Sequence, residues 1–446
     1  MKIVLAVHAY PPEGVGGTEL LTQALAQELA RAGHAVLVVS GSLEVGSGTR
    51  ASQDGDVRVL RLRREDLYFD HWQKGTSYPV RRAWRELLAA ERPDVVHVQH
   101  WLRLSNELVL DAAHAGVPAV VSLHDHTTSC LLAFRVRPED GAACEASYGP
   151  MACVSCAGKV APRTPWVPID QQYLSFAMRR STLERELTLA RKVCVPSAAH
   201  AAALLRFGVP DVGLEVVAPL GPVLARRTAP TGSTPFTLGV WGIWSPLKGT
   251  DLIVQAARES GVRLVLAGRA STPEFDAELR ALAEGSVEFH GPFEARDLAT
   301  HAVTNVHAMV CGSRAPESYG RVLDEARALG LPAILPNAGA FAERADSGVH
   351  FYTPGDGPDL VRAIRALADD SARLAAMRAE VPLPDPTGMD AYLALYAAAI
   401  EQGAPASADL PQTEWFEERM AEAAQAEWDA GCSRTPEDAL GVGDAT

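Results

Sequence analysis

The sequence predicts two α/β domains, each built on a doubly wound parallel sheet, with a short linker between them. First, 446 residues are too many for one typical core and suit two domains. Second, two separate stretches alternate short apolar runs with segments of helical periodicity. Third, residues 221–234 separate those stretches and have the composition of a linker. A ligand is therefore expected in a cleft between the two lobes.

The first lobe is expected to span residues 1–220. Residues 3–9 are a continuous apolar run, as in a parallel strand that is covered on both faces. After a glycine-bearing loop, residues 18–32 carry leucines at helical spacing up to Gly33, which ends the helix. The other expected elements are strands at 35–40, 57–62, 95–98, 119–123 and 193–196, and helices at 79–91, 170–191 and 200–207. Residues 127–169 are rich in Cys, Pro and Gly, which predicts an insertion or long loop.

The second lobe is expected to span residues 235–385. Its expected strands are 236–243, 263–267, 287–289, 306–310 and 332–335, with helices at about 250–259, 274–283, 294–302, 319–329 and 357–379. The segment 386–403, with a helix at 389–402, is expected to pack back on the first lobe. Residues 404–446 are polar and predict a partly disordered tail.

Charge and hydropathy exclude several classes of protein. The net charge of −14 argues against sequence-independent binding to nucleic acid, which needs a basic face. The apolar run that ends at Val7 is too short for a secretory signal, and no run of about 18 apolar residues could span a membrane. The sequence therefore predicts a cytoplasmic protein whose seven cysteines are reduced.

Basic and aromatic residues gather at 78–85 and leave two interpretations open. The residues concerned are Tyr78, Arg81, Arg82, Trp84 and Arg85. They suit a helix that lies on a membrane surface, which would make the protein peripheral at the inner face of the membrane. The alternative, which we favour, is a solvated helix face with Trp84 tucked inward.

The most informative segment runs from Pro316 to Gly330, where a strand is followed by a helix. Ser318 suits the N-cap and Gly330 the position after the helix, so the first turn would present free amides to an anion. Glu317 and Glu325 are separated by roughly 10 Å along such a helix, at about 1.5 Å per residue. They are too far apart for a close acid/base pair, but they suit hydroxyls at opposite ends of an extended polyol ligand. The alternative is that both are solvated surface residues.

This segment resembles the Glu-x7-Glu motif of the retaining GT-B glycosyltransferases of the GT4 family, including a following Gly-x-Pro at residues 330–332. The resemblance covers most of residues 1–400 and implies the GT-B fold, in which two Rossmann-like lobes face each other across a cleft. It implies that Glu317 contacts the transferred sugar and that Glu325 binds the ribose hydroxyls. The amides of Tyr319 and Gly320, with Ser318 beside them, would meet the diphosphate.

Residues 242–249 resemble the Gly-Arg-x4-Lys-Gly turn of the same family. Lys248 matches the lysine that neutralises the diphosphate. Ile243 stands where the family has arginine, and an apolar side chain cannot donate to phosphate. We expect Arg314, just upstream of Glu317, to act as the substitute cation.

The loop at 13–19 resembles the family's Gly-Gly loop after the first strand. Gly16 and Gly17 are expected to let the backbone approach the donor phosphates closely. The loop is not Gly-x-Gly-x-x-Gly, and no acidic residue ends the second strand, which counts against a dinucleotide oxidoreductase.

Four histidines, His8, His97, His100 and His124, lie at expected strand ends that would face the cleft. His124 resembles the family histidine beside the transferred sugar, and we assign it a catalytic role. Asp125 and His100 are assigned to the acceptor side, where Asp125 would orient the ring of His124 or the acceptor hydroxyl. The alternative for each histidine is a structural role in the core.

Four cysteines, Cys130, Cys144, Cys153 and Cys156, form a C-x13-C-x8-C-x2-C set within the insertion. Four thiolates suit tetrahedral zinc, and the final C-x2-C has the spacing of a metal knuckle. A similar segment with such cysteines occurs in a subset of the resembling family. A structural zinc and four free thiols remain equal alternatives, while a disulfide is less suited to a reducing compartment.

The resemblance implies retaining transfer of a sugar from a UDP- or GDP-sugar to an acceptor hydroxyl on a glycan, a lipid-linked sugar or a small molecule. Front-face attack is favoured, with Lys248 and helix amides stabilising the leaving diphosphate electrostatically. We expect catalysis to require no cofactor or divalent cation. Two rivals remain: an epimerase of the same architecture, which converts the nucleotide-sugar without an acceptor, and a non-catalytic sugar-nucleotide binding protein.

Overall fold

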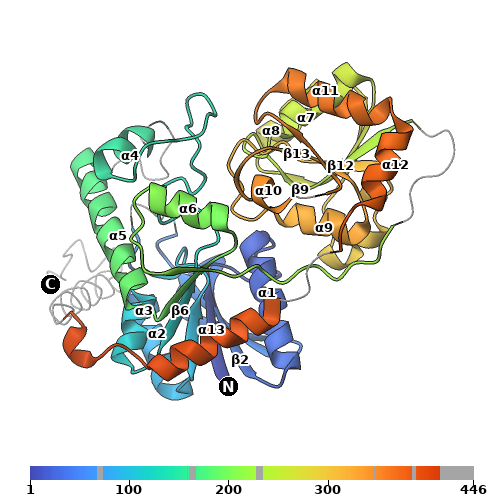
Figure 1. The fold of residues 1–446 in the computed structure, drawn as a ribbon. Helices are drawn as coiled ribbons and strands as arrows, with labels where there is room; N and C mark the ends of the chain where they lie inside the picture. The colour runs from blue at the N-terminus through green and yellow to red at the C-terminus, as the bar shows by residue number, and fades with distance from the viewer. Residues whose placement is uncertain are drawn as a thin grey trace, which may run out of the picture.

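The computed structural model describes residues 1–67, 74–157, 159, 167–227, 235–345, 347–383 and 388–411. Two lobes are visible in Figure 1, each with a sheet flanked by helices. The first lobe has eight strands in the order β3-β4-β2-β1-β5-β6-β7-β8, and the second has six in the order β11-β10-β9-β12-β13-β14. Every strand pairing in the two sheets is parallel except that of β3 with β4. The predicted fold class, two doubly wound α/β domains, is confirmed.

The first lobe is organised around apolar strands that helices cover on both faces. β1, β5 and β6 are almost fully buried, as the continuous apolar runs predict. In chain order its elements are β1 Lys2–Val7, α1 Gly17–Arg31, β2 Ala35–Val45, β3 Thr49–Asp54, β4 Val57–Arg64, α2 Tyr78–Glu91, β5 Val95–Val98, α3 Leu108–His114, β6 Ala119–Ser122, α4 Pro150–Ala157, α5 Ile169–Leu189, β7 Lys192–Val195, α6 Ala198–Arg206 and β8 Leu214–Val216.

The second lobe repeats the alternation of strand and helix, and its helices bury apolar faces against a six-stranded sheet. In chain order the elements from here to the C-terminus are β9 Thr237–Trp244, α7 Thr250–Ser260, β10 Arg263–Ala270, α8 Pro273–Ala283, β11 Val287–His290, the 3-10 turns η1 Ala295–Thr300 and η2 Ala302–Thr304, β12 Ala308–Val310, α9 Arg321–Leu329, β13 Ala333–Pro336, α10 Gly339–Arg344, β14 Val349–Tyr352, α11 Gly357–Ala368, α12 Ser371–Ala379, α13 Gly388–Gln402 and η3 Ser407–Asp409.

Several predicted elements are wrong in detail. Of the two interpretations of residues 127–169, the long loop is wrong, because the segment contains α4 and a bridge between Val136 and Ala143. The helix predicted at 294–302 is two 3-10 turns. The helix predicted at 357–379 is two helices, because the Asp370 side chain accepts a hydrogen bond from the Arg373 amide and starts α12 anew. Short elements without strong periodicity, such as β3, α3 and β14, had no clear sequence signal.

The chain crosses between the lobes twice, because α13 follows the second lobe but packs on the first. Figure 1 shows α13 lying along the first lobe. Its buried residues Leu395 and Tyr396 join the apolar cluster that contains Ile3 and Leu5 of β1. The Tyr396 hydroxyl also lies 2.8 Å from Nδ1 of His97. Part of the predicted tail is ordered as well, since Leu410 packs with Leu110, whereas residues 412–446 lie outside the described residues.

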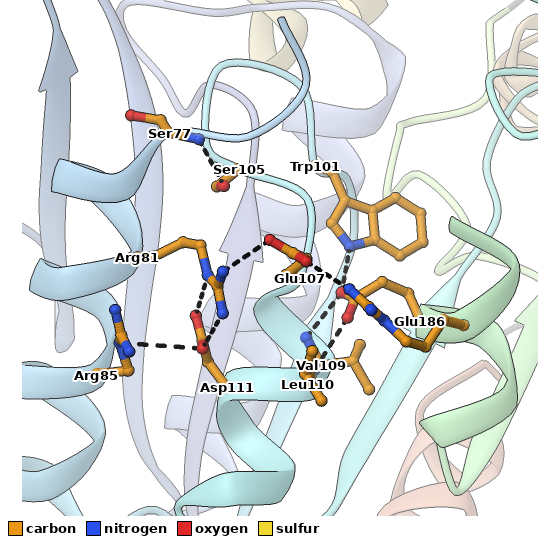
Figure 2. Close-up of polar contacts among 11 residues, drawn as sticks. Ser77, Arg81, Arg85, Trp101, Ser105, Glu107, Val109, Leu110, Asp111 and Glu186 are labelled. Atoms are coloured by element: carbon orange, nitrogen blue, oxygen red, sulfur yellow. Dashed lines mark hydrogen bonds and ion pairs between the residues drawn. The ribbon is translucent and has the colours of Figure 1, made fainter. Parts of the chain in front are cut away.

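The basic segment 78–85 is divided, because Arg81 belongs to a buried polar network whereas Arg82 lies on the exposed face of α2. Arg81 is 2% exposed and donates to both carboxylate oxygens of Asp111, at 2.9 and 2.7 Å, and to Glu107 at 2.8 Å (Figure 2). Trp84 is fully buried, as expected, and its indole N–H donates to the Leu108 carbonyl. The prediction that Arg81 faces solvent is therefore wrong. Among the described helices, none is long and apolar enough to cross a bilayer.

Beside this network, Glu186 of α5 binds the start of α3. Its carboxylate accepts hydrogen bonds from the amides of Val109 and Leu110 and from the indole N–H of Trp101, at 2.8 to 3.0 Å (Figure 2). Burial raises the pKa of Glu186 to about 7, against the opposing effect of these donors. The network thus ties α2, α3 and α5 together through charged groups in the interior.

Candidate functional site

The loop between β12 and α9 lies at the junction of the two lobes. The Oγ of Ser318 donates to the carbonyl of His124 in the first lobe, and the Ser318 carbonyl accepts from Oγ of Ser197, 2.7 Å away. The predicted N-cap role of Ser318 is wrong, because α9 begins at Arg321 and the capping residue is Gly320. Gly320 has a φ of 75°, and a Cβ there would lie 2.2 Å from the Phe341 ring, so glycine is required.

A second contact holds the lobes together. The Glu343 carboxylate of α10 accepts from the amides of Ala198 and Ala199 at 3.1 and 2.6 Å. These amides open α6, so a carboxylate of one lobe caps a helix of the other and meets the positive end of its dipole. The residues around Ser318 are therefore held next to the first lobe.

Glu317 and Lys248, expected to serve one ligand, are direct neighbours. The Lys248 ammonium donates to Glu317 Oε1 at 2.6 Å, and the Ser313 hydroxyl donates to the same oxygen. Burial would raise the pKa of Glu317, but the charge of Lys248 and these hydrogen bonds lower it. Burial would likewise lower the pKa of Lys248, but the charge of Glu317 raises it. Both groups are therefore charged at neutral pH, and Lys248, whose side chain is 46% exposed, is accessible.

Glu325 lies on α9 and faces the sheet. Its Oε2 accepts from the Trp241 indole at 2.7 Å, and Arg321 lies 3.5 Å from Oε1. Burial raises the pKa of Glu325, partly offset by the charge of Arg321. The side chains of Glu317 and Glu325 are only 16% and 17% exposed, so the alternative that both are solvated surface groups is wrong.

Arg314, expected as a substitute cation, is held in a bidentate ion pair. Its guanidinium donates to the two carboxylate oxygens of Asp251 at 2.9 and 2.7 Å and also to the Pro246 carbonyl. Asp251 lies in the first turn of α7. This arrangement gives Arg314 a structural role, since it joins the loop after β12 to the turn after β9.

The glycine loop of the first lobe closes over Glu19. A Cβ on Gly16 would lie 2.6 Å from Glu19 Oε2, so a side chain there would displace the end of the Glu19 side chain, whereas a Cβ on Gly17 would meet nothing within 4 Å. Glu19 is itself 3.2 Å from His8 Nε2. Of the two glycines expected in the donor site, Gly16 is thus the one that lies against a neighbouring side chain.

The predicted acceptor-side residues form one polar cluster. His100 accepts from the Leu102 amide through Nδ1, so Nε2 carries the proton and faces Asp125 Oδ2 at 3.3 Å. Burial would raise the pKa of Asp125, but the electrostatic interaction with His100 and hydrogen bonds from His100 and Thr127 lower it. His124 instead pairs with Gln99, 2.6 Å away, so Asp125 orients His100 and not His124.

Two assignments of histidines need correction or addition. His97, expected to face the cleft, is fully buried between Ser122 and Tyr396 and has a structural role. His126 and His200 were not predicted, yet their rings lie 4.7 Å apart at the lobe junction. The signal for His126 was available, because it follows His124 and Asp125 directly, whereas nothing local distinguishes His200.

The buried histidines predict acid sensitivity. Burial lowers the pKa of His97 and His200 to about 3, and of His124 and His126 to about 4. These folded-state pKa values lie below the unfolded value of about 6.5. Below about pH 6.5 the unfolded chain therefore binds more protons than the folded chain, and the free energy of unfolding decreases. Glu186 has the opposite effect, because its pKa is raised to about 7 in the folded chain and its protonation as the pH falls favours folding. This single proton is outweighed by those of the four histidines. We expect urea unfolding midpoints to fall between about pH 7.5 and 5.5.

Replacing one of these histidines should weaken that dependence. His97→Gln is expected to reduce the change in unfolding free energy by up to about 1.4 kcal/mol per pH unit. Equal pH dependence in the wild type and His97→Gln would show that His97 is protonated in the folded protein.

The four cysteines of the insertion share one neighbourhood without forming a ligand cage. Burial raises the pKa of Cys156, and the charges of Cys130, Cys144 and Cys153 add to that effect. Each of the four is a free thiol. In the part of the chain that the structure describes, no three His, Cys, Asp or Glu side chains are grouped so as to hold a metal ion.

Comparison with known proteins places both lobes in one class of enzyme. The family model described as Glycosyltransferase Family 4 matches residues 15–219, and the model described as Glycosyl transferases group 1 matches residues 236–370. D-inositol 3-phosphate glycosyltransferase 1 of Catenulispora acidiphila is 30% identical over 70% of this chain and 73% of its own. A GDP-mannose-dependent alpha-mannosyltransferase of Mycobacterium tuberculosis is 26% identical over 76% and 80% of the two chains.

Solved structures agree on the fold. Sucrose-phosphate synthase from Thermosynechococcus elongatus matches with a TM-score of 0.59 at 17% identity, covering 90% of this chain and 97% of that chain. Anabaena HepE in complex with UDP and glucose matches with a TM-score of 0.57 at 18% identity, covering 90% and 98%. These matches support the GT-B arrangement of two α/β lobes. With family models on both lobes and a 30% identical relative matched over most of its length, the chain belongs to glycosyltransferase family 4 and is a glycosyltransferase.

Proposed function

We propose that this enzyme transfers a sugar, with retention of configuration, from a nucleoside diphosphate sugar to an acceptor hydroxyl. The observation that carries the proposal is the Lys248–Glu317 pair at the lobe junction, with Glu325 eight residues further along. Lys248 suits the diphosphate, Glu317 the hydroxyls of the transferred sugar, and Glu325 the hydroxyls of a ribose. The name of the mannosyltransferase supports a GDP-sugar donor, and that of the inositol phosphate glycosyltransferase supports a polyol phosphate acceptor.

The proposed mechanism is electrostatic. Lys248 is charged and accessible, so it would neutralise the diphosphate as the bond to the sugar breaks. Glu317 would accept hydrogen bonds from the sugar hydroxyls, and the backbone at 318–320 would contact the phosphates. His124, which burial keeps neutral because its pKa falls to about 4, would hydrogen-bond the sugar without adding charge. Attack would come from the same face as the leaving diphosphate.

The acceptor would lie against the first lobe. His100 and Asp125 form an oriented pair there, and Glu19 with His8 forms another beneath the glycine loop. Each pair offers both a hydrogen-bond donor and a hydrogen-bond acceptor, which suits a substrate with several hydroxyl groups. The first acceptors to test are therefore inositol phosphates, with glycans and lipid-linked sugars after them.

We propose that transfer needs no divalent cation. The Asp-x-Asp sequence of this chain, residues 54–56, lies at the turn between β3 and β4. Its Asp54 accepts hydrogen bonds from Tyr10, Gln23 and Gln27, so this carboxylate is engaged. We expect full activity in chelator. Loss of activity that magnesium or manganese restores would contradict the proposal.

Incubation with UDP- and GDP-sugars tests the function. We expect nucleotide release that depends on an acceptor and a product whose anomeric configuration, read by NMR, matches that of the donor. Isomerisation without an acceptor would indicate an epimerase, binding without turnover a non-catalytic protein, and an inverted product a different mechanism. Each of these results would overturn the proposal.

We also propose that Cys130, Cys144, Cys153 and Cys156 bind a structural zinc ion. Four free thiols in one neighbourhood support this, although their described positions do not form a cage. We expect about one zinc per purified chain and its loss in Cys153→Ser/Cys156→Ser. Cys194→Ser, at a buried cysteine of β7, is the control and should retain the metal. Metal-free wild-type protein would rule the site out.

A further inference from the structure

Arg269 is an unused cation at the carboxyl end of β10. Its side chain is exposed and forms no ion pair or hydrogen bond with another of the described residues. The neighbouring cations are already engaged: Lys248 with Glu317, Arg314 with Asp251, and Arg280 with Asp276. An exposed guanidinium without a partner, at the edge of a sheet where ligands of α/β proteins bind, is available to an external anion.

The register of the sheet places Arg269 beside the position that lacks its arginine. In the parallel pairing of β9 with β10, Arg269 is the partner of Ile243. Partners on neighbouring strands are about 4.8 Å apart and project from the same face of the sheet. Both follow a glycine with positive φ, 105° at Gly242 and 136° at Gly268, so the two strand ends turn in the same way.

The surroundings leave room for a ligand. Arg269 lines a hollow of about 390 Å³ together with Gly268, His290, Gly291 and Thr272. Ile243 is 45% exposed and offers no competing polar group. The hollow lies at the ends of β9, β10 and β11, and Lys248 follows β9 by four residues at the same edge of the sheet.

We infer that Arg269 is the second cation of the diphosphate site, supplied from β10 in place of an arginine at Ile243 on β9. This inference rests on the proposed function. A planar guanidinium binds phosphate oxygens in a bidentate manner, which a lysine cannot, so Arg269 would fix the orientation of the diphosphate while Lys248 supplies a point charge.

Calorimetric titration of the full chain with UDP and with GDP tests the inference. Arg269→Gln is expected to weaken binding of whichever nucleotide the wild type binds by at least about 10-fold. Arg263→Gln is the matched control, because Arg263 begins the same strand at the opposite edge and is also exposed. The control should bind within about twofold of the wild type.

The decisive experiment moves the positive charge from β10 to β9. The double variant Ile243→Arg/Arg269→Gln should recover most of the lost affinity, because a cation from either strand reaches the same phosphates. Wild-type affinity in Arg269→Gln, or a double variant as weak as Arg269→Gln, would overturn the inference and leave the proposed function intact. A wild type that binds neither nucleotide would overturn the proposed function and this inference with it.

Discussion

Lys248→Ala is expected to lower kcat/KM for sugar transfer by about 100-fold or more, because removal of one preorganised group that stabilises developing charge costs that much in other enzymes. Lys248 is the cation that contacts Glu317, at 2.6 Å, and its side chain remains accessible. The variant also leaves Glu317 without its ionic partner, so Glu317 should take up a proton more readily. Initial rates over a range of donor concentrations measure the effect.

The control for this prediction is Arg362→Ala, which removes a cation from a side chain that is 68% exposed on α11. Its kcat/KM should stay within about twofold of the wild type. Thermal melting of both variants separates loss of catalysis from loss of fold. A folded Lys248→Ala enzyme that retains more than about one third of wild-type kcat/KM would contradict the proposed role.

Arg81→Met is expected to destabilise the protein by about 3 kcal/mol, because breaking a buried ion pair leaves uncompensated charge in the interior. Asp111 and Glu107 would lose three hydrogen bonds from Arg81. Burial raises the pKa of Asp111 even with its cationic neighbours present, so its charge is costly here. Arg185 still donates to Glu107, which limits the loss to the lower end of the usual range.

Urea unfolding of Arg81→Met and Arg82→Met gives the measurement and its control. Arg82 is the next residue on the same helix, but its side chain is 73% exposed and pairs with Glu86 four residues on. Its replacement should cost no more than about 0.5 kcal/mol. Similar unfolding midpoints for the two variants would mean that the interior charges of Figure 2 do not contribute as argued.

The sequence predicted features that local pattern encodes. The alternation of apolar runs and helical periodicity indicated both sheets, since burial of a strand or a helix face leaves a period in the chain. The resemblance to family motifs also implied that Glu317 and Lys248 serve one ligand, although they are 69 residues apart, and the structure places them in contact.

Features that depend on a partner distant in sequence were missed. Ser318 has the composition of an N-cap, yet its hydroxyl binds the His124 carbonyl of the other lobe, 194 residues away. Arg81 reads as a surface cation until Asp111, 30 residues on, is folded against it. Arg314 likewise pairs with Asp251, and no local sequence pattern predicts this ion pair. In each case the sequence shows a polar side chain, but the distant group that it binds could not be predicted from it.

The return of α13 to the first lobe makes that lobe discontinuous in the chain, and this affects how it folds during translation. Its apolar cluster includes Tyr392, Leu395 and Tyr396, which are synthesised roughly 180 residues after β8. At about 5–20 residues per second, a ribosome needs roughly 10 to 40 s to make that intervening stretch. During this interval the second lobe, which is continuous, can complete its own core. The first lobe must wait with part of its apolar surface uncovered, so nascent chains of intermediate length are where chaperone binding should peak.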